Sequence, residues 1–381
     1  MSSVKNKNYK LSNINFEVED KKIFDEYCQP DKYGRNYKYY PLILPARNDN
    51  QEMIVIGDLH GDFELTIKVL KLAKLIDDNN KWIGNDTYVI QVGDQIDNYR
   101  PLDKKNYEEK ENSEIVSSYS GESPEDIKIL DFFTKLNTEA NEKGGAVISL
   151  LGNHEIMNVN GNMNYVSQND IEKFKNYKDK EKQDVVFANA KEARIHSFKP
   201  GNEYAKLLAC TRIPALIIGS YIFVHAGFIN KFLNEMQINN RNDLYKINYV
   251  MKLWLLGLID KDYVIDIINS KPYSLFWDRI LGNIPSNISN DDPRCAKYLN
   301  DVLRLFDVKS MIIGHTPQFV KQHTGINKTC GNGLWRVDFG GSFAFHKFDE
   351  LYNEKGKKIT DLRRAQVLRI RGDNNEPEIL Q

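Results

Sequence analysis

The chain has 381 residues, of which 41% are hydrophobic and 28% are charged, so it is long enough for one large domain or two ordinary ones with a sizeable core. A formal net charge of −1 provides no global field that would recruit nucleic acid or an anionic membrane, and we expect neither as a partner. The first residues lack the apolar core of a signal peptide, and no run approaches the roughly 20 apolar residues of a membrane span, so we expect a soluble cytoplasmic protein.

The cysteines support the same compartment. They are scattered and form no CxxC pair, at Cys28, Cys210, Cys295 and Cys330. This spacing argues against a cysteine zinc site and against a disulfide framework, and it favours a reducing compartment over secretion.

We expect three regions along the chain. Residues 1–48 form an N-terminal extension, residues 49–372 form the main domain, and residues 373–381 form a flexible tail. The main domain contains inserted stretches near residues 99–122, 158–200 and 229–275, the last of which reads as helices. These insertions either shape a site or are plain surface insertions.

Short, β-branched apolar runs that end in Gly, His or Asp recur along the chain. In order they are "MIVIGDLHG", "TYVIQVGDQID", "AVISLLGNHE", "SYIFVHAG", "SMIIGHTP" and "LWRVDFGG". Such runs are typical of strands buried on both faces, and their polar ends lie where open α/β folds place ligands. Between them, apolar residues at 3-to-4 spacing predict helices over residues 62–77 and 123–145, which begin near Asp62 and Ser123. The alternation predicts α/β layers.

The first motif, "GDLHG", places two metal-binding side chains two residues apart. In an extended chain such residues face the same way, so Asp58 and His60 can point together at one cation. A carboxylate and an imidazole together suit Mn, Fe or Zn. Taken alone, however, this pair is more often an accident of a polar loop.

The other predicted strand ends favour a metal site. They supply Asp94, Asn153, His154, His225 and His315. Four of the seven histidines, counting the one in "GDLHG", directly follow a predicted buried strand. One such histidine is usually explained by hydrogen bonding in the core, but four of them with carboxylates in equivalent places indicate a metal centre.

The ordered motifs "GDLHG", "GDQID", "GNHE", "VHAG" and "GHTP" resemble the calcineurin-like metallophosphoesterases of the phosphoprotein phosphatase type. "GNHEIMNVNGNMNYV", "LFWDR" and "CGNGLWRVDFGGS" resemble most closely the Shewanella-like protein phosphatases, and the similarity covers about residues 50 to 345. The resemblance implies a four-layer αββα sandwich, the metallo-dependent phosphatase fold. "GHTPQ", which has no second histidine, favours this type over the phosphodiesterases that end in GHxH.

The same resemblance implies a ligand set for two metal ions, Mn, Fe or Zn. Asp58, His60 and Asp94 hold the first ion, and Asp94 bridges to the second. Asn153, His225 and His315 complete the ligand set of the second ion. Together they activate a water as hydroxide for attack on a phosphate monoester.

The resemblance also assigns a general acid and its partner. His154 protonates the departing oxygen, and Asp97 keeps its imidazole protonated and oriented. The alternative is that Asp97 caps a turn and His154 only supports the site. Glu155 is expected to hold the loop by hydrogen bonds.

The phosphate clamps depart from the family pattern. The second motif usually reads GDxxDR, but here Asn98 stands in place of the arginine, and it carries no charge. Two alternatives follow for Arg100: its side chain reaches back to bind the phosphate, or it has no part in binding it. Arg279 in "LFWDR" is a further phosphate-binding candidate, unless it pairs on the surface with an acid such as Asp278.

Three functions remain open at this stage. The first is a two-metal phosphomonoesterase, a protein phosphatase acting on Ser/Thr or Tyr, whose partner is a phosphoprotein or another phosphomonoester. The second is a nucleotide or polyphosphate hydrolase of the same fold. The third is an inactive binding scaffold, which the missing arginine at position 98 suggests and the complete ligand set disfavours.

Overall fold

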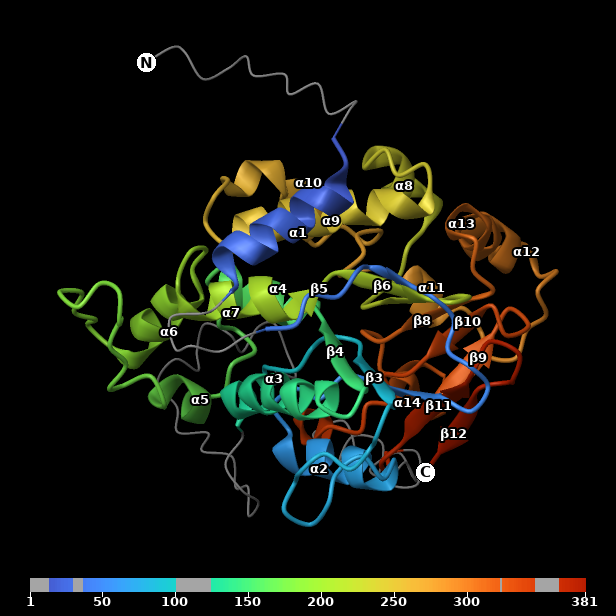
Figure 1. Cartoon of the computed structure of the whole chain (residues 1–381), viewed down its shortest axis with the longest axis horizontal. Coiled ribbons are helices and arrows are strands. Elements are labelled where there is room, and N and C mark those ends of the chain that lie inside the picture. Colours follow the sequence, from blue (N-terminus) through green and yellow to red (C-terminus); the bar gives the residue numbers. More distant parts are fainter. Residues whose placement is uncertain (1–13, 30–36, 101–124, 323, 347–362) are drawn as a thin grey trace.

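Two six-stranded sheets form the centre of the protein (Figure 1). The computed structural model describes residues 14–29, 37–100, 125–322, 324–346 and 363–381. Sheet A consists, in spatial order, of β1 (Ile43–Leu44), β6 (Ala215–Ile218), β7 (Tyr221–Val224), β8 (Ser310–Ile313), β10 (Leu334–Arg336) and β9 (Asn327–Thr329). Sheet B consists of β12 (Glu378–Leu380), β11 (Val367–Arg371), β2 (Glu52–Ile56), β3 (Tyr88–Gln91), β4 (Ala146–Leu150) and β5 (Arg212–Ile213).

The strands that carry the sequence motifs run parallel within each sheet. In sheet B, β2, β3 and β4 are parallel, so that Ile56 pairs with Gln91 and Gln91 pairs with Ser149. In sheet A, β7 and β8 are parallel. Because parallel strands end at the same edge of a sheet, the loops after these strands meet along one edge.

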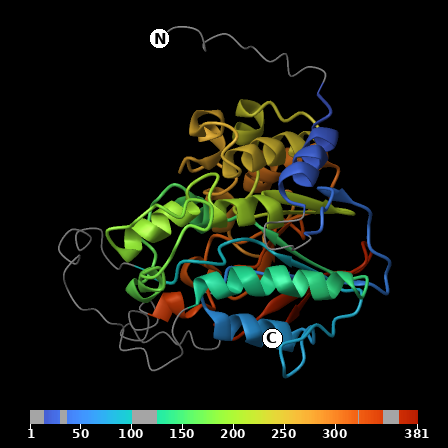
Figure 2. The same ribbon diagram turned by 60° about the vertical axis from the view of Figure 1, so that its left-hand side comes forward.

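Helices cover the outer faces of both sheets. Those described are α1 (Phe16–Tyr27), α2 (Phe63–Leu72), α3 (Asp126–Asn141), α4 (Asn153–Val159), α5 (Gln168–Glu172), α6 (Ala190–Phe198), α7 (Glu203–Thr211), α8 (Asn230–Glu235), α9 (Leu244–Leu255), α10 (Ile265–Ile268), α11 (Ile280–Asn283), α12 (Pro293–Cys295), α13 (Asp301–Phe306) and α14 (Gln318–Lys321). Figure 2 shows α2 and α3 side by side on one side of the strands and α1 and α9 on the other. None of the helices in the described ranges has the length and apolar character needed to cross a bilayer.

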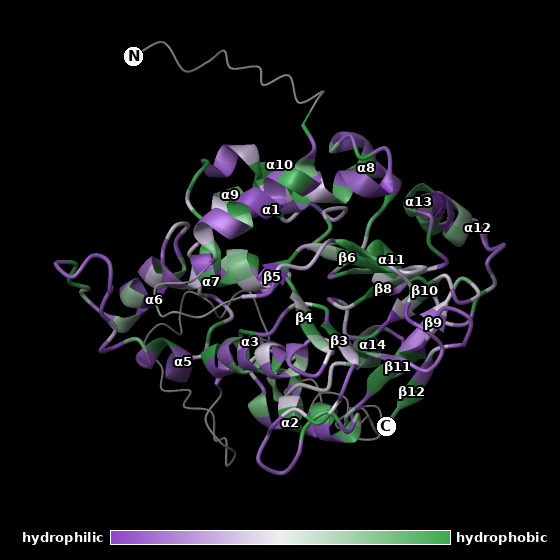
Figure 3. Cartoon of the chain, in the orientation of Figure 1, coloured by the Kyte–Doolittle hydropathy of each residue, from purple (hydrophilic) through white to green (hydrophobic). Residues whose placement is uncertain are grey.

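Alternating side chains of sheet A join two separate hydrophobic clusters. Leu216 and Ile218 of β6 pack with sheet B, α2 and α3, whereas Ala215 and Ile217 pack with α7 and α9. Each fully buried aliphatic side chain contributes about 1.5–3 kcal/mol. In Figure 3 the apolar colour gathers in strands such as β6 and β11, while α3 alternates along its length. The predicted αββα sandwich is therefore confirmed.

The two predicted helices form close to their expected positions. Asp62 caps α2, because its side chain accepts a hydrogen bond from the backbone N–H of Leu65. Helix α3 begins at Asp126, and the predicted start at Ser123 lies outside the described residues. After α3 the chain reverses at Gly144, whose φ of 80° favours glycine.

Both ends of the chain contribute strands to the sheets. The N-terminal extension supplies α1 and also β1, which pairs with β6. The expected flexible tail instead contains β12, in which Leu380 pairs with Val367 and Glu378 with Arg369. The sequence indicated a frayed tail because "GDNNEPEILQ" is largely polar, yet its last apolar residues fit beside β11. Residues 229–275, which were predicted to be helical, contain α8, α9 and α10.

The expectation of unpaired cysteines is wrong. Disulfide bonds join Cys28 to Cys210, with Cα atoms 5.4 Å apart, and Cys295 to Cys330, with Cα atoms 5.6 Å apart. Sequence spacing gave no sign of this, because the partners of the first pair lie 182 residues apart and meet only when α1 and α7 both pack against α9. The cysteines therefore give no support to a reducing compartment.

Candidate metal centre and phosphate site

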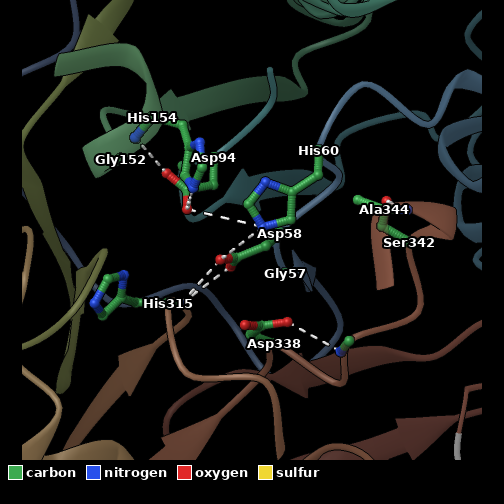
Figure 4. A network of polar contacts seen from close by, with 12 residues as sticks. Gly57, Asp58, His60, Asp94, Gly152, His154, His315, Asp338, Ser342 and Ala344 are labelled. Atoms are coloured by element: carbon green, nitrogen blue, oxygen red, sulfur yellow. Dashed lines mark hydrogen bonds and ion pairs between the residues drawn. The ribbon is translucent and has the colours of Figure 1, made fainter. Parts of the chain in front are cut away.

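The predicted site residues meet at the edge where the parallel strands end. Each is at most 6% exposed: Asp58, His60, Asp94, Asp97, Asn153, His154, His225 and His315. The loops after β2 and β3 supply the aspartates and the first histidine, α4 begins with the next pair, and β7 and β8 each precede one histidine. Figure 4 shows four of these side chains, Asp58, His60, Asp94 and His154, pointing toward one another.

The backbone of the site is tightly turned rather than extended. His60, Asp94, Asp97 and His315 have φ values of 46°, 53°, 70° and 66°. Such left-handed conformations are uncommon outside glycine and gather at functional sites. The extended geometry expected for "GDLHG" is therefore wrong, since β2 ends at Ile56, although the turn still brings His60 Nε2 to 3.9 Å from an oxygen of Asp58.

Asp94 lies at the centre of the site. Its carboxylate oxygens lie 3.4 Å from His225 Nε2, 3.8 Å from His154 Nε2 and 3.9 Å from His60 Nε2. Two groups of potential ligands result, His60–Asp94–His154 and Asp94–His225–His315, each with its ligand atoms within 4.8 Å of one another. Asp94 belongs to both groups.

The side-chain oxygen of Asn153 joins two of the histidines. It lies 2.9 Å from His225 Nε2 and 2.8 Å from His315 Nδ1. On the opposite side of its ring, His225 Nδ1 lies 2.9 Å from the carbonyl oxygen of Val92, and a proton on Nδ1 would leave the Nε2 lone pair facing the site. The residues predicted for the second metal are thus brought together.

The donor set fits cations. Burial raises the pKa of Asp58, and the carboxylates of Asp338 and Asp94 raise it further. Burial likewise raises the pKa of Asp338 to about 7. His315 Nε2 and one oxygen of Asp338 are buried without a hydrogen-bond partner among the described residues. Clustered buried carboxylates and orphaned donor atoms need a positive charge nearby, and mixed carboxylate and imidazole ligands suit Mn, Fe or Zn.

His154 and Asp97 form a buried pair beside this cluster. His154 Nδ1 lies 2.8 Å from one oxygen of Asp97, and the other oxygen accepts a hydrogen bond of 2.8 Å from the side chain of Asn158. His154 Nε2 therefore faces Asp94 and the cluster. Glu155 holds the loop as expected, since it accepts hydrogen bonds from the backbone N–H groups of Asp94, Gln95 and Gly152.

The three candidate phosphate-binding residues lie in different settings. Arg100 packs against the rings of Tyr165 and Phe345, at 5.6 and 5.1 Å. Burial lowers the pKa of His60, and the charge of Arg100 lowers it further, so Arg100 is close to the site. Asn98 donates its amide to Asp170, at 2.5 Å.

Arg279 is exposed and donates to the carbonyl oxygen of His315 at 3.2 Å. The carboxylate of Asp278 instead accepts the backbone N–H groups of Ile280 and Leu281. Among the described residues, Arg279 therefore does not form the surface ion pair with Asp278 that was the alternative role for it.

Sequence reasoning left some nearby residues without a role. Asp338 follows strand β10, just as the other aspartates follow their strands, and this position is the signal that singled out "WRVDFGG". Figure 4 shows Asp338 beside Asp58. Asn158 and Arg194 adjoin Asp97. Asn158 lies in the quoted stretch "GNHEIMNVNGNMNYV" but was given no role, and Arg194 gave no signal because it lies in a polar stretch that reads as an insertion.

The profile of the calcineurin-like phosphoesterase family matches residues 53–319. Shewanella-like protein phosphatase 2 of Arabidopsis thaliana is 28% identical over 329 residues, covering 79% of this chain and 74% of that protein. Shewanella-like protein phosphatase 1 of Plasmodium berghei is 30% identical over 299 residues, covering 77% and 68%. An uncharacterized protein of Acanthamoeba polyphaga mimivirus is 36% identical over 242 residues, covering 60% and 94%.

The fold also resembles a solved structure. The crystal structure of a cold-active protein-tyrosine phosphatase of a psychrophilic Shewanella species superposes with a TM-score of 0.60, covering 90% of this chain and 83% of that protein. At 18% identity this likeness concerns the fold alone.

Proposed function

Because the chain belongs to the calcineurin-like phosphoesterase family and is a metal-dependent phosphatase, we propose that it hydrolyses phosphate monoesters on protein side chains. The observation that carries the proposal is the position of Asp94, whose carboxylate belongs to both groups of potential metal ligands. The protein phosphatase relatives, which match more than three quarters of the chain, support a phosphoprotein as the substrate.

The ligand assignment keeps the second group and changes the first, in which Asp58 takes the place of His154 because His154 is assigned to proton transfer. Asp58, His60 and Asp94 would hold one cation, and Asp94, Asn153, His225 and His315 the other. When bound, two such cations neutralise the phosphate and lower the pKa of a water so that it can attack. Asp94 suits the bridging position because its two oxygens approach histidines on different sides: one is 3.4 Å from His225 Nε2, and the other is 3.9 Å from His60 Nε2.

His154 supplies the proton that the leaving group requires. The water releases one proton to solvent and attacks as hydroxide, so that one P–O bond forms while the bond to the substrate oxygen breaks, and that oxygen takes the proton from His154 Nε2. Asp97, 2.8 Å from Nδ1, holds the ring in the orientation that points Nε2 at the cluster. Until the proton is transferred the imidazole is positively charged, and the same carboxylate stabilises that charge.

Arg100 and Arg279 bind the phosphate oxygens in this proposal. Arg100 packs against the Tyr165 and Phe345 rings and donates to the carbonyl oxygens of Asp97 and Tyr99, and from this position it would take the place of the arginine that the family usually has at position 98. Arg279 is tied by its hydrogen bond to the backbone of the ligand His315. Asn98 is the weakest of the three candidates, because its amide is already bonded to Asp170.

The test is a substrate panel on protein purified with Mn²⁺. Phosphopeptides that differ only in phosphotyrosine, phosphoserine or phosphothreonine are assayed for phosphate release, beside diadenosine polyphosphate and bis-p-nitrophenyl phosphate. We expect phosphopeptides to be hydrolysed fastest. Faster hydrolysis of the diester or of the dinucleotide would refute the protein phosphatase assignment in favour of a nucleotide or polyphosphate hydrolase.

Two histidine variants separate the chemistry from general damage. His154→Ala removes the proposed acid, whereas His196→Ala removes a histidine that pairs with Asp179 and belongs to neither group of potential metal ligands. General acids commonly contribute about 10²- to 10⁴-fold, so only the first variant is expected to lose that much kcat. Equal losses in both variants would contradict the role of His154.

A further inference from the structure

A buried polar cluster lies behind the His154–Asp97 pair. Asp97 is fully buried, and each of its oxygens has a separate partner, His154 Nδ1 at 2.8 Å and Asn158 Nδ2 at 2.8 Å. Rotation of the Asp97 carboxylate would break both contacts. The orientation of Asn158 therefore bears on the orientation of His154.

Arg194 determines which way the amide of Asn158 points. Its Nε and Nη2 atoms donate to the side-chain oxygen of Asn158 at 3.1 and 2.9 Å. An amide whose oxygen accepts this forked pair must turn its NH₂ group the other way, toward Asp97. Without the guanidinium the two amide orientations would be closer in energy, and one of them would turn an oxygen against a carboxylate.

Arg194 is itself held in place from several elements. It is fully buried on α6, its Nη2 atom lies 2.6 Å from Asp126 at the start of α3, and its guanidinium lies 5.3 and 5.2 Å from the rings of Phe174 and Phe198. Its Nη2 atom also lies 3.8 Å from Asp97. One buried cation thus faces two buried carboxylates, and removing it would take from Asp126 the cation 2.6 Å away, while Asp97 would keep His154.

We propose that Arg194 and Asn158 are positioning residues through which the insertion at residues 158–200 fixes Asp97 against His154. The inference rests on the proposed role of His154 as the acid. It gives this insertion a part in the chemistry, because α6 carries Arg194 and α4 carries both Asn158 and His154. The competing interpretation is that Arg194 only anchors α6 to α3 through Asp126.

The dependence of the rate on the leaving group separates these interpretations. A p-nitrophenolate leaves with little help from an acid, whereas phenolate requires a proton, so a misplaced His154 slows phenyl phosphate more than p-nitrophenyl phosphate. For Arg194→Gln we expect kcat on phenyl phosphate to fall about 10- to 100-fold, as is usual when the partner of a site residue is lost, with a markedly smaller fall on p-nitrophenyl phosphate and little change in KM.

Two further variants test the route of the effect. Asp126→Asn removes the anchor of α6 but leaves Arg194 bonded to Asn158, so the ratio of the two rates should stay that of wild type. Asn158→Asp keeps the acceptor for Arg194 but replaces the donor to Asp97, so the ratio should shift as in Arg194→Gln, even where Arg194→Gln itself fails to fold.

A matched control accounts for the loss of a buried ion pair. Lys252→Gln breaks the buried pair between Lys252 and Asp20, which are 2.6 Å apart and lie on α9 and α1. Its rate ratio should be that of wild type, although its melting temperature falls.

The outcomes are distinct. An unchanged ratio in both Arg194→Gln and Asn158→Asp, or an equal shift in Asp126→Asn, would overturn the positioning role. In His154→Ala the ratio should shift most. If it shifts there but in neither positioning variant, only the present inference fails. If it is unchanged in His154→Ala, the proposed acid is wrong and the inference falls with it.

Discussion

The two disulfide bonds permit a quantitative prediction, because each closes a loop of known length. All four cysteines are buried, and the pairs Cys28–Cys210 and Cys295–Cys330 span 182 and 35 residues. We consider the paired replacements Cys28→Ala with Cys210→Ala, and separately Cys295→Ala with Cys330→Ala. Both leave the proposed site residues unchanged.

The chain-entropy relation gives the expected loss of stability. It predicts that the free energy of unfolding falls by about 5 kcal/mol without the long-range bond and by about 4 kcal/mol without the short-range bond. The dependence on loop length is logarithmic, so a fivefold longer loop adds only about 1.5 kcal/mol. Residual structure in the unfolded chain reduces both values, but the long-range bond should remain the more important one.

Urea unfolding followed by tryptophan fluorescence, without reductant, measures these differences. Wild type treated with dithiothreitol while unfolded should match a variant that lacks all four cysteines, which serves as the control. A thiol count on the denatured, unreduced wild type should find no free thiol. Four free thiols, or two double variants as stable as wild type, would refute the reasoning.

Four other outcomes follow from the site. Asp94→Asn should abolish turnover and lower the metal content measured by mass spectrometry while leaving the circular dichroism spectrum unchanged; activity near that of wild type would exclude the bridging role. Chelation of the metals should remove activity and lower the melting temperature, and added Mn²⁺ should restore both; a chelated enzyme that keeps its turnover would contradict a metal-dependent reaction. Arg100→Ala and Arg279→Ala should each lower kcat/KM about 10- to 100-fold, since a hydrogen bond to a charged group contributes about 1.5–3 kcal/mol; if Arg100→Ala matches wild type, it does not replace the missing arginine. Asp338→Asn should weaken Mn²⁺ binding in a titration, because the orphaned oxygen of Asp338 lies beside Asp58; unchanged affinity would place Asp338 outside the metal centre.

The α/β layers and the convergence of the site were predictable because their signals are local, whereas the αββα arrangement came from the family resemblance. A buried strand needs only a few apolar residues in a row, and parallel strands bring their ends together wherever they lie in the chain. Asp94, His225 and His315 could thus be grouped without knowing any distance, as could Asn153.

What sequence reasoning could not supply were contacts between distant segments of ordinary composition. Cys28 and Cys210 meet through helix packing that no spacing rule encodes. Arg194 looks like any surface arginine of a charged stretch until α6 folds against α3. The left-handed conformation of His60 was also missed. The apolar pattern that predicts β2 ends before His60, so it says nothing about the backbone at that residue.

The pairing of β11 with β2 also bears on how the protein is made. β2 precedes the first metal motif, yet one of its edges is covered only by β11, some three hundred residues later in the chain. Since synthesis proceeds from the N-terminus, every proposed metal ligand emerges from the ribosome before that edge can close. During this interval β2 presents an open, apolar strand to other chains, as unpaired edges do. The pairing of β11 with β2 therefore completes sheet B only after all the proposed metal ligands have been made.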